Sequence, residues 1–459
     1  MNINKHSNTA DPANTQNSKH CSHVLALILL SMVAAAPSMA DITTYPIRSL
    51  TAAAPVFDTP DDFADLAVLG EAIGDKSLVL LDELTHGEGN VFAYKSRIVR
   101  YLHQHKGFDV LVLESGLFDL DKIRQSPQPI ADQAPGNLFY MYARSAQMQP
   151  LFQYLSHSRT STRPLALAGF DGRFSGTLST SQLVPEFRLF LQKQLLQKQL
   201  LQKQPQQIFV PQSQSEAYLQ QIQQLLDGKL SAATPAIQQK FLNINQSIAA
   251  MLQPGKLPGT ALEAGFWFRI NASLRQMALV SWQQRRFDEH DLAMAANLQW
   301  LLDQQYAGRK VIVWGHYIHL NRLGGFQNAL HAPQTPVAQR LTVANMTSAL
   351  AEQTLKNSYV LHFSGAEGSY IDFRDLQEVD VKSSEPMLES TLTRQAGADV
   401  FVPLPQNSAS LQPLWGHEYK SKLSWQQAQQ RFDGMILLQQ ITPAKLLPSS
   451  GDRAKPVAQ

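Results

Sequence analysis

Short runs of consecutive apolar residues recur along the chain, and polar positions follow each of them. The first two runs, Leu78–Leu81 and Val110–Leu113, frame a stretch from Val91 to Leu102 in which apolar residues fall at helical spacing. Continuous apolar runs of this length are typical of strands covered on both faces. Gly107 supplies a stop for the helix. The segment predicts a strand–helix–strand unit, whose right-handed crossover requires a parallel sheet.

Further runs of the same kind predict four more strands, at 164–169, 310–314, 359–363 and 434–438. Strands that alternate with helical patterns indicate an α/β fold. We expect a mostly parallel sheet flanked by helices, with an inserted helical lobe.

The pattern changes between residues 174 and 290, where helical spacing dominates and glutamine is frequent. Within this region, 191–207 repeats every five residues, so each Leu-Leu pair moves ~140° around a helix and no single buried stripe forms. We interpret this tract as an exposed helix expanded by repetition. The predicted organisation is an α/β core in two parts, 41–173 and 291–459, with 174–290 as the inserted lobe.

The N-terminal 40 residues resemble an export signal. An apolar run from Val24 to Ala36 follows a polar leader, and Ser38-Met39-Ala40 places small residues before a cut after Ala40. The run is too short to favour a stable membrane anchor, although an uncleaved anchor is the alternative. Cys21 is the only cysteine, so the mature chain has none, and a periplasmic or secreted location follows as an expectation.

Composition excludes little else. The chain has 459 residues, 44% of them apolar, and a formal net charge of +2. A large core is therefore affordable, and nothing favours nucleic acid as a partner.

Candidate chemistry collects at the strand ends. In open parallel sheets, ligands bind beyond the carboxyl ends of the strands. The residues that stand at or just after these ends are Glu83, His86, Glu114, Asp171, His316 and His319. Each alone has an ordinary structural explanation, such as a solvated loop acid, a helix cap or a buried salt bridge. Together they predict one polar site above the sheet.

Other catalytic signatures are missing from the sequence. It contains no G-x-S-x-G elbow, no H-E-x-x-H and no glycine-rich phosphate loop, and no thiol remains after the predicted cleavage. What remains is histidine and carboxylate chemistry on a water molecule, with or without a metal.

Five segments, in order along the chain, resemble the erythromycin esterase family. "DELTHGEGNVFAYKSRIVRYL" is similar to its GE-x-THG segment, "VLVLES" to its second strand, "HDLAMAANLQWLL" to its RD-x-x-MA-x-N helix, "VIVWGHYIHLNR" to its WAHN-x-HV segment, and "FDGMILLQQITPAKLL" to its last strand. The resemblance implies hydrolysis of a carboxylic ester by activated water. It implies His86 as general base, Glu83 and Glu114 as assisting carboxylates, and His316 and His319 as residues that line the cleft and stabilise the oxyanion.

Three positions depart from the family pattern. Asp82 stands in place of glycine, Tyr317 in place of asparagine and His290 in place of arginine. These changes leave the hydrolytic residues in place and bear on the substrate. The residues that we expect to contact the substrate are Asp82, Lys95, Asp171, His290 and Tyr317.

The leading hypothesis is a periplasmic hydrolase of a small-molecule carboxylic ester or lactone that requires no cofactor. One alternative is metal-assisted hydrolysis of an ester or amide, with Glu83, His86, Glu114 and either His316 or His319 as ligands. Another is a periplasmic protein that binds a ligand or metal without turnover.

Overall fold

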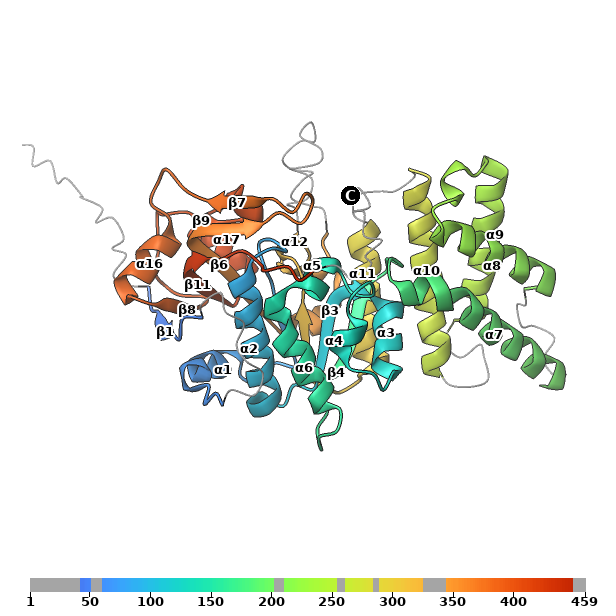
Figure 1. The fold of residues 1–459 in the computed structure, drawn as a ribbon, viewed down its shortest axis with the longest axis horizontal. Helices are drawn as coiled ribbons and strands as arrows, with labels where there is room; N and C mark the ends of the chain where they lie inside the picture. Colours follow the sequence, from blue (N-terminus) through green and yellow to red (C-terminus); the bar gives the residue numbers. More distant parts are fainter. Residues whose placement is uncertain are drawn as a thin grey trace, which may run out of the picture.

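The computed structural model describes residues 42–50, 60–201, 210–253, 261–283, 289–324 and 344–448 (Figure 1). The predicted signal segment 1–40 and the part of the glutamine-rich tract after Leu201 lie outside these residues. Over the described part of the chain, no helix combines the length and apolar character needed to cross a membrane.

A central sheet organises the described residues. Its strand order is β1-β8-β11-β6-β2-β5-β3-β4, and β7 pairs with β6. Neighbours from β11 to β4 are parallel, whereas β1, β7 and β8 join in antiparallel fashion. The bounds are β1 Tyr45–Ile47, β2 Leu78–Leu81, β3 Val110–Gly116, β4 Ala166–Asp171, β5 Val311–Trp314, β6 Ser358–Ile371, β7 Glu378–Val381, β8 Asp399–Pro403 and β11 Gly434–Ile441. A two-stranded sheet pairs β9 (Leu414–Trp415) with β10 (Lys422–Leu423). The predicted mostly parallel α/β class is confirmed.

The six expected strands are the six parallel ones, because each is buried on both faces along its apolar run. β2, β5 and the first six residues of β3 are buried throughout. The antiparallel strands were not predicted. β7 reads EVDV and is mostly exposed, and β1 has three residues, so neither shows a continuous apolar pattern.

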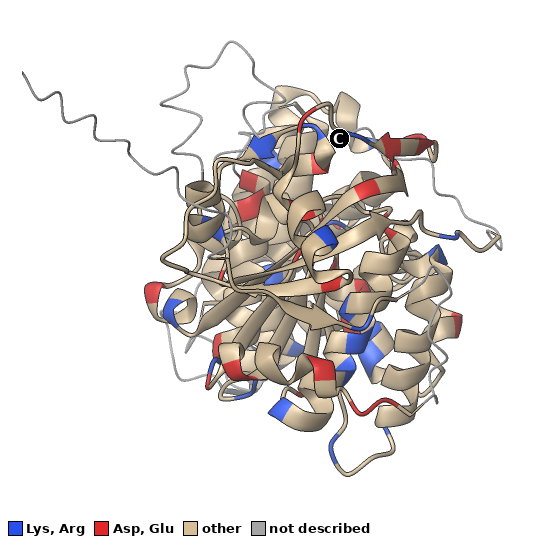
Figure 2. Ribbon diagram, turned by 90° about the vertical axis from the view of Figure 1, so that its left-hand side faces the viewer, with Lys and Arg blue, Asp and Glu red and all other residues tan. Residues whose placement is uncertain are grey.

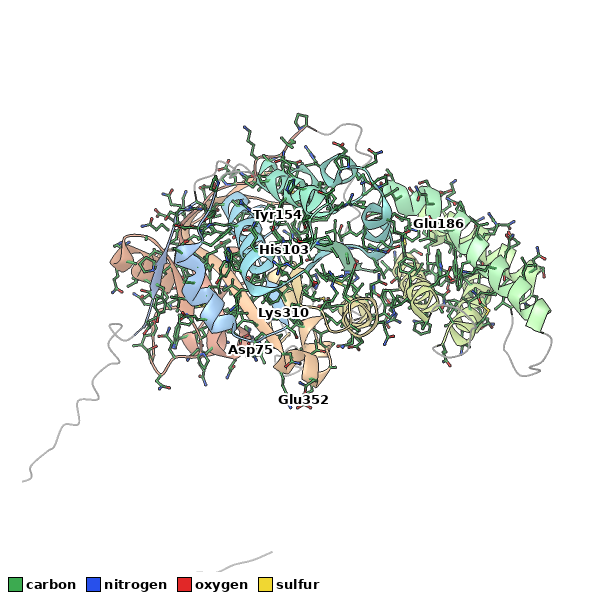
Figure 3. The ribbon with its side chains drawn as sticks, turned by 90° about the horizontal axis from the view of Figure 1, so that it is seen from below. Asp75, His103, Tyr154, Glu186, Lys310 and Glu352 are labelled. Atoms are coloured by element: carbon green, nitrogen blue, oxygen red, sulfur yellow. The ribbon has the colours of Figure 1, made fainter. Side chains whose placement is uncertain are left out.

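Helices cover the sheet (Figure 1). The helix expected after β2 is α2 (Gly89–Lys106), and Gly107 ends it in the left-handed region at φ +77°. Its side chains are buried on almost every side, and a hydrogen bond of 2.6 Å between His103 and Tyr154 joins it to α6 (Gln149–Ser158; Figure 3). The other helices around the sheet are α1 Ala67–Ile73, α3 Leu117–Gln125, α4 Ile130–Gln133, α5 Tyr140–Arg144, α6 Gln149–Ser158, α11 Glu289–Trp300, α12 Tyr317–Leu320, α15 Glu352–Lys356, α16 Leu388–Ala396 and α17 Trp425–Arg431.

Between β4 and α11, the described residues form helices only. These are α7 Thr177–Leu201, α8 Gln212–Leu226, α9 Pro235–Met251 and α10 Ala261–Ser281, which lie together beyond the β4 edge (Figure 1). They have an aromatic core in which Phe187 stacks on Trp267, with ring centroids 4.7 Å apart. Lys122 of α3 binds Glu186 of α7 at 2.7 Å and ties these helices to α3 beside the sheet. The exact limits proposed for the lobe, 174–290, stay a prediction.

Charged residues of both signs are interspersed over the ribbon (Figure 2). This distribution agrees with the small net charge of +2. Among the described residues, several buried charged groups, including Glu83 and Glu114, lie at the carboxyl ends of the parallel strands.

Candidate active site

The sheet order brings the strand-end residues together. β2, β5, β3 and β4 are consecutive neighbours, and all four are parallel. Their carboxyl ends therefore share one edge, which receives Glu83 and His86 after β2, Glu114 from β3, Asp171 from β4 and His316 after β5. The predicted convergence is confirmed: the His86 and His316 ring centroids are 4.6 Å apart, and those of His316 and His319 are 6.4 Å apart.

His86 is held in a defined tautomer by Glu83. Its Nδ1 lies 3.0 Å from Glu83 Oε1, and the same oxygen accepts a bond of 2.6 Å from the Tyr142 hydroxyl. The other carboxylate oxygen binds the Lys95 ammonium. Because an ionised carboxylate only accepts, His86 Nδ1 carries the proton and Nε2 presents a lone pair. In this tautomer Nε2 is the ring atom that can accept a proton.

The charge of Glu83 is neutralised by Lys95, which is fully buried. Burial alone would raise the pKa of Glu83, but Lys95 and the hydrogen bond from His86 hold that pKa below its ordinary value. The Lys95 ammonium also lies 4.3 Å from the centre of the Trp314 ring. Burial lowers the pKa of Lys95 from its ordinary value, and the attraction of Glu83 opposes that shift, so each charge of the pair depends on the other.

Glu114 occupies a bulge in the pairing of β3 with β4, a feature that re-aims side chains. Its Oε2 accepts a 2.7 Å bond from the backbone N–H of His316. Gly315 makes this approach possible, since a Cβ there would lie 2.9 Å from the same oxygen. The other oxygen, Oε1, lies 3.9 Å from His86 Nε2 and 3.6 Å from His319 Nε2. Gaps of this size suit a water that bridges the groups.

His319 forms a second histidine–carboxylate pair. Its Nδ1 lies 3.0 Å from Asp291 Oδ1, and the other Asp291 oxygen accepts from the Met346 N–H at 2.9 Å. Burial alone would lower the pKa of His319, but Asp291 and Glu114 outweigh it and raise the pKa to about 9. His319 is therefore an imidazolium at neutral pH, with its Nε2–H directed toward Glu114.

His316 lies between these pairs and is neutral. Burial, followed by neighbouring histidines, lowers its pKa well below the ordinary value. The Ile318 N–H donates to its Nδ1 at 3.3 Å, which places the proton on Nε2. No hydrogen-bond partner meets Nε2 among the described residues, and the His417 ring lies beyond it with centroids 5.3 Å apart.

Two of the residues expected to contact substrate reach the site. Asp171 is bonded to Arg173, and His290 Nε2 lies 3.9 Å from Asp171 Oδ1. Arg173 also lies 3.9 Å from Glu114 Oε1, and its side chain is 44% exposed. Arg173 therefore connects the buried carboxylates with solvent.

The geometry argues against direct substrate contact by the other three. Asp82 has no exposed surface and uses both oxygens, on His362 Nδ1 at 2.8 Å and on the Phe363 N–H at 2.9 Å. Lys95 and Tyr317 are also fully buried. Sequence proximity to the catalytic segments was misleading, because it does not say which way a side chain points: Asp82 turns to β6, and Lys95 points from α2 to the far oxygen of Glu83. These three residues support the site from behind.

Several functional neighbours were missed by sequence reasoning. Tyr142 and Phe139 come from the segment around α5, and Arg173 follows β4. His417 and Glu418 lie between β9 and β10, where the Glu418 N–H donates to the Leu84 carbonyl at 3.2 Å. The one available signal for the last pair was two adjacent metal-ligand residue types after Gly416.

The reacting groups are almost enclosed. The His86 side chain is 7% exposed, and the Phe139 and Phe373 rings approach it with centroids 4.7 and 5.1 Å away.

The metal-ligand set expected from the sequence, which included Glu83, is poorly suited to an ion, because Tyr142, Lys95 and His86 already occupy both oxygens of Glu83.

The sequence model of the erythromycin esterase family matches residues 103–441. The chain belongs to the erythromycin esterase family. Glu83 and His86 precede the matched range, so their assignment depends on the geometry above. YbfO of Bacillus subtilis (strain 168), whose name assigns it provisionally to the hydrolases, is 25% identical over 400 residues, which are 83% of this chain and 88% of YbfO.

Solved structures of related fold cover most of the chain. A Bacillus cereus protein aligns with a TM-score of 0.63 at 18% identity, over 89% of this chain and 97% of its own. A succinoglycan biosynthesis protein aligns with a TM-score of 0.64 at 16% identity, over 87% of this chain and 95% of its own. A mutant of the erythromycin esterase EreC in its open conformation aligns with a TM-score of 0.60 at 16% identity, over 88% of this chain and 98% of its own. At these identities the likeness establishes the fold.

Proposed function

We propose that this member of the erythromycin esterase family hydrolyses a carboxylic ester or lactone by means of water activated at His86. One observation carries the proposal: His86 Nδ1 is fixed on Glu83 at 3.0 Å while its Nε2 faces Glu114 across 3.9 Å. A water bonded to both atoms would be held by a carboxylate and deprotonated by an oriented imidazole.

The two histidine pairs supply complementary steps. His86 takes the proton as the water attacks the carbonyl, and Glu83 stabilises the imidazolium that forms. The cationic His319, 3.6 Å from Glu114, donates toward the developing oxyanion. The same Nε2–H then protonates the leaving alkoxide, after which the carboxylic acid and alcohol depart.

The substrate class follows from the surroundings of the base. The Phe139 and Phe373 rings give an apolar approach to His86, and the half-exposed Arg173 offers a cation near Glu114. We propose a small ester or lactone with an apolar acyl part. We also propose that the N-terminal segment acts as an export signal, which would place the reaction in the periplasm or outside the cell.

The test compares His86→Ala with His157→Gln, a histidine variant on an exposed position of α6. On a panel of carboxylic esters and lactones, followed by proton release, we expect the first variant to lose ~10²–10⁴-fold in kcat. The second should match the unaltered protein. Full activity in His86→Ala would reject the mechanism. No turnover by the unaltered protein on any ester, together with a rise in Tm on adding one of them, would instead establish a binding protein.

A further inference from the structure

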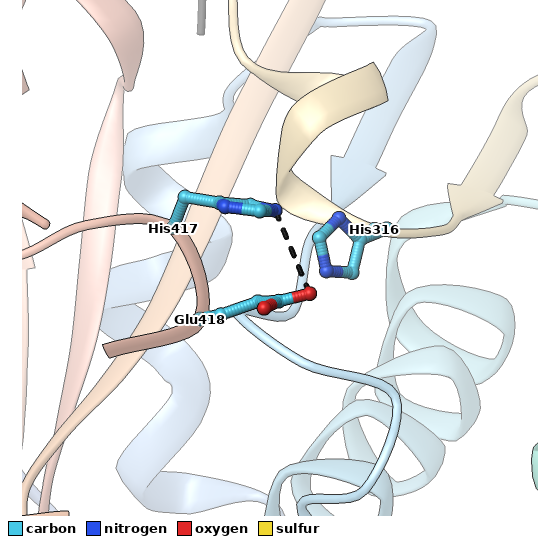
Figure 4. Close-up of side chains that lie close together, drawn as sticks. All are labelled: His316, His417 and Glu418. Atoms are coloured by element: carbon cyan, nitrogen blue, oxygen red, sulfur yellow. Dashed lines mark ion pairs between the residues drawn. The ribbon is translucent and has the colours of Figure 1, made fainter. Parts of the chain in front are cut away.

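One group of three metal-ligand side chains lies close together in the described part of the chain. It consists of His316, His417 and Glu418, whose ligand atoms all lie within 4.8 Å of one another. All three side chains are buried, and the His316 ring and the Glu418 carboxylate face each other (Figure 4). This group adjoins the proposed base but shares only His316 with the predicted site.

We infer that His316, His417 and Glu418 bind a single divalent transition-metal ion of the Zn²⁺ type. Two imidazoles and a carboxylate are a ligand set that zinc accepts, and three protein ligands leave one position for water or another small ligand. Bonds of ~2.0–2.2 Å to each ligand require donor atoms somewhat closer than those found here. His417 Nε2 and Glu418 Oε1 are 3.9 Å apart, so a contraction of a few tenths of an ångström suffices for that pair.

The unpartnered His316 Nε2 points to a ligand independently of the cluster. His316 is 2% exposed, and its Nε2 has no hydrogen-bond partner among the described residues. A buried polar atom without a partner is costly and calls for an explanation. A metal ion between His316 and Glu418 would give His316 Nε2 a partner.

Loading changes two existing interactions. The His316 proton must move from Nε2 to Nδ1, which releases the long 3.3 Å bond from the Ile318 N–H. Glu418 must also share its charge with the ion, since it now binds Arg374 and, at 2.7 Å, Lys420. Both cations are about half exposed, and Asp372 lies 3.1 Å from Arg374 and 3.9 Å from Lys420 as a second acceptor. They can therefore release Glu418 without being left unpaired.

The backbone presents the two new ligands in a constrained way. Glu418 and Tyr419 both adopt left-handed φ values, +52° and +55°, which non-glycine residues rarely do. This conformation turns the Glu418 side chain toward His316, while its N–H is bonded to the Leu84 carbonyl. A preformed loop reduces the ordering that metal binding would require.

The experiment uses the full chain without an affinity tag, stripped with chelator and titrated with Zn²⁺ alone. We expect one equivalent to bind, Tm to rise, and His417→Gln and Glu418→Gln each to weaken binding by at least ~100-fold, more than the 10–100-fold typical of second-shell changes. The His157→Gln variant serves as the matched control for adventitious surface histidines and should bind as the unaltered protein does. Two variants are made so that one misfolded protein does not decide the outcome.

Equal Zn²⁺ affinity in both variants and the unaltered protein would overturn the inference, as would loss of binding in the control. The readout is binding, so it is separable from the proposed hydrolysis. His86→Ala should keep its metal even where turnover is lost, whereas failure of the metal site would leave hydrolysis by the apoprotein untouched.

Discussion

Replacing Glu83 with glutamine isolates the step on which the catalytic proposal depends. Three donors now point at this carboxylate: His86 Nδ1 and the Tyr142 hydroxyl on one oxygen, and Lys95 on the other. Glutamine offers one oxygen, and its amide nitrogen only donates. The charged Lys95 is the strongest donor, so the oxygen should turn toward it. The amide N–H₂ then faces His86 Nδ1 and makes that atom an acceptor.

The consequence for His86 is a change of tautomer. With Nδ1 accepting, the proton sits on Nε2, the atom that must take a proton from water. We expect kcat to fall by ~10²–10⁴-fold, or about 2.7–5.4 kcal/mol of transition-state stabilisation, while KM changes little. The variant also leaves the fully buried Lys95 without its counter-charge, which should lower the free energy of unfolding by about 3–5 kcal/mol. Denaturant unfolding checks that the variant remains folded under assay conditions.

A second substitution separates the tautomer from a simple loss of charge. In Glu83→Gln/Lys95→Met the cation is gone, so the glutamine oxygen is free to accept from His86 and Tyr142. The double variant should then regain at least tenfold in kcat over Glu83→Gln, although it lacks two charges. Assays on the ester and lactone panel measure both variants. Wild-type turnover in Glu83→Gln, or a double variant no faster than the single one, would refute the reasoning.

Three further outcomes are expected. Asp291→Asn weakens the support for the cationic His319, whose pKa is raised to about 9, so the high-pH limb of kcat/KM should move to lower pH; an unmoved limb would separate His319 from catalysis. Asp119, buried with its pKa raised to about 7, binds more protons folded than unfolded between pH 4 and 7. As pH rises through that window, the free energy of unfolding should therefore fall, and the fall should be about a few kcal/mol larger in the unaltered protein than in Asp119→Asn. Urea unfolding measures it, and the same pH dependence in both proteins would contradict this prediction. Tyr142→Phe removes one donor to Glu83 and should lower kcat about tenfold with the fold intact, as circular dichroism would verify.

The parallel strands could be predicted from the sequence because burial on both faces requires a continuous run of apolar residues. Runs such as Leu78–Leu81 tolerate no polar residue at any position. Two of the antiparallel strands lack this pattern, since β7 is largely exposed and β1 has three residues. β8 does carry it: Val400, Phe401 and Val402 are buried, so the sequence held a local signal for this strand that the prediction did not use.

For the candidate site, position along the chain predicted which residues gather but not which way they point. The strand-end rule placed His86, Glu114 and His316 correctly at one edge. It could not tell that Asp82 turns away to His362, because that pairing spans 280 residues. Nor could it find His417, which arrives from a short hairpin without any periodic pattern.

The arrangement explains how one buried site can hold both a base and an acid built from the same parts. His86 and His319 each bind a carboxylate through Nδ1 at 3.0 Å, and each directs Nε2 at the same oxygen of Glu114. They differ in what surrounds the supporting carboxylate. Glu83 is shared with the buried Lys95 and with Tyr142, whereas Asp291, together with Glu114, raises the pKa of His319 to about 9. We propose that this difference assigns the roles, with His86 as the base toward water and His319 as the donor to the product, since enzymes assign acid and base at one pH through environments that push the pKa values of like groups apart.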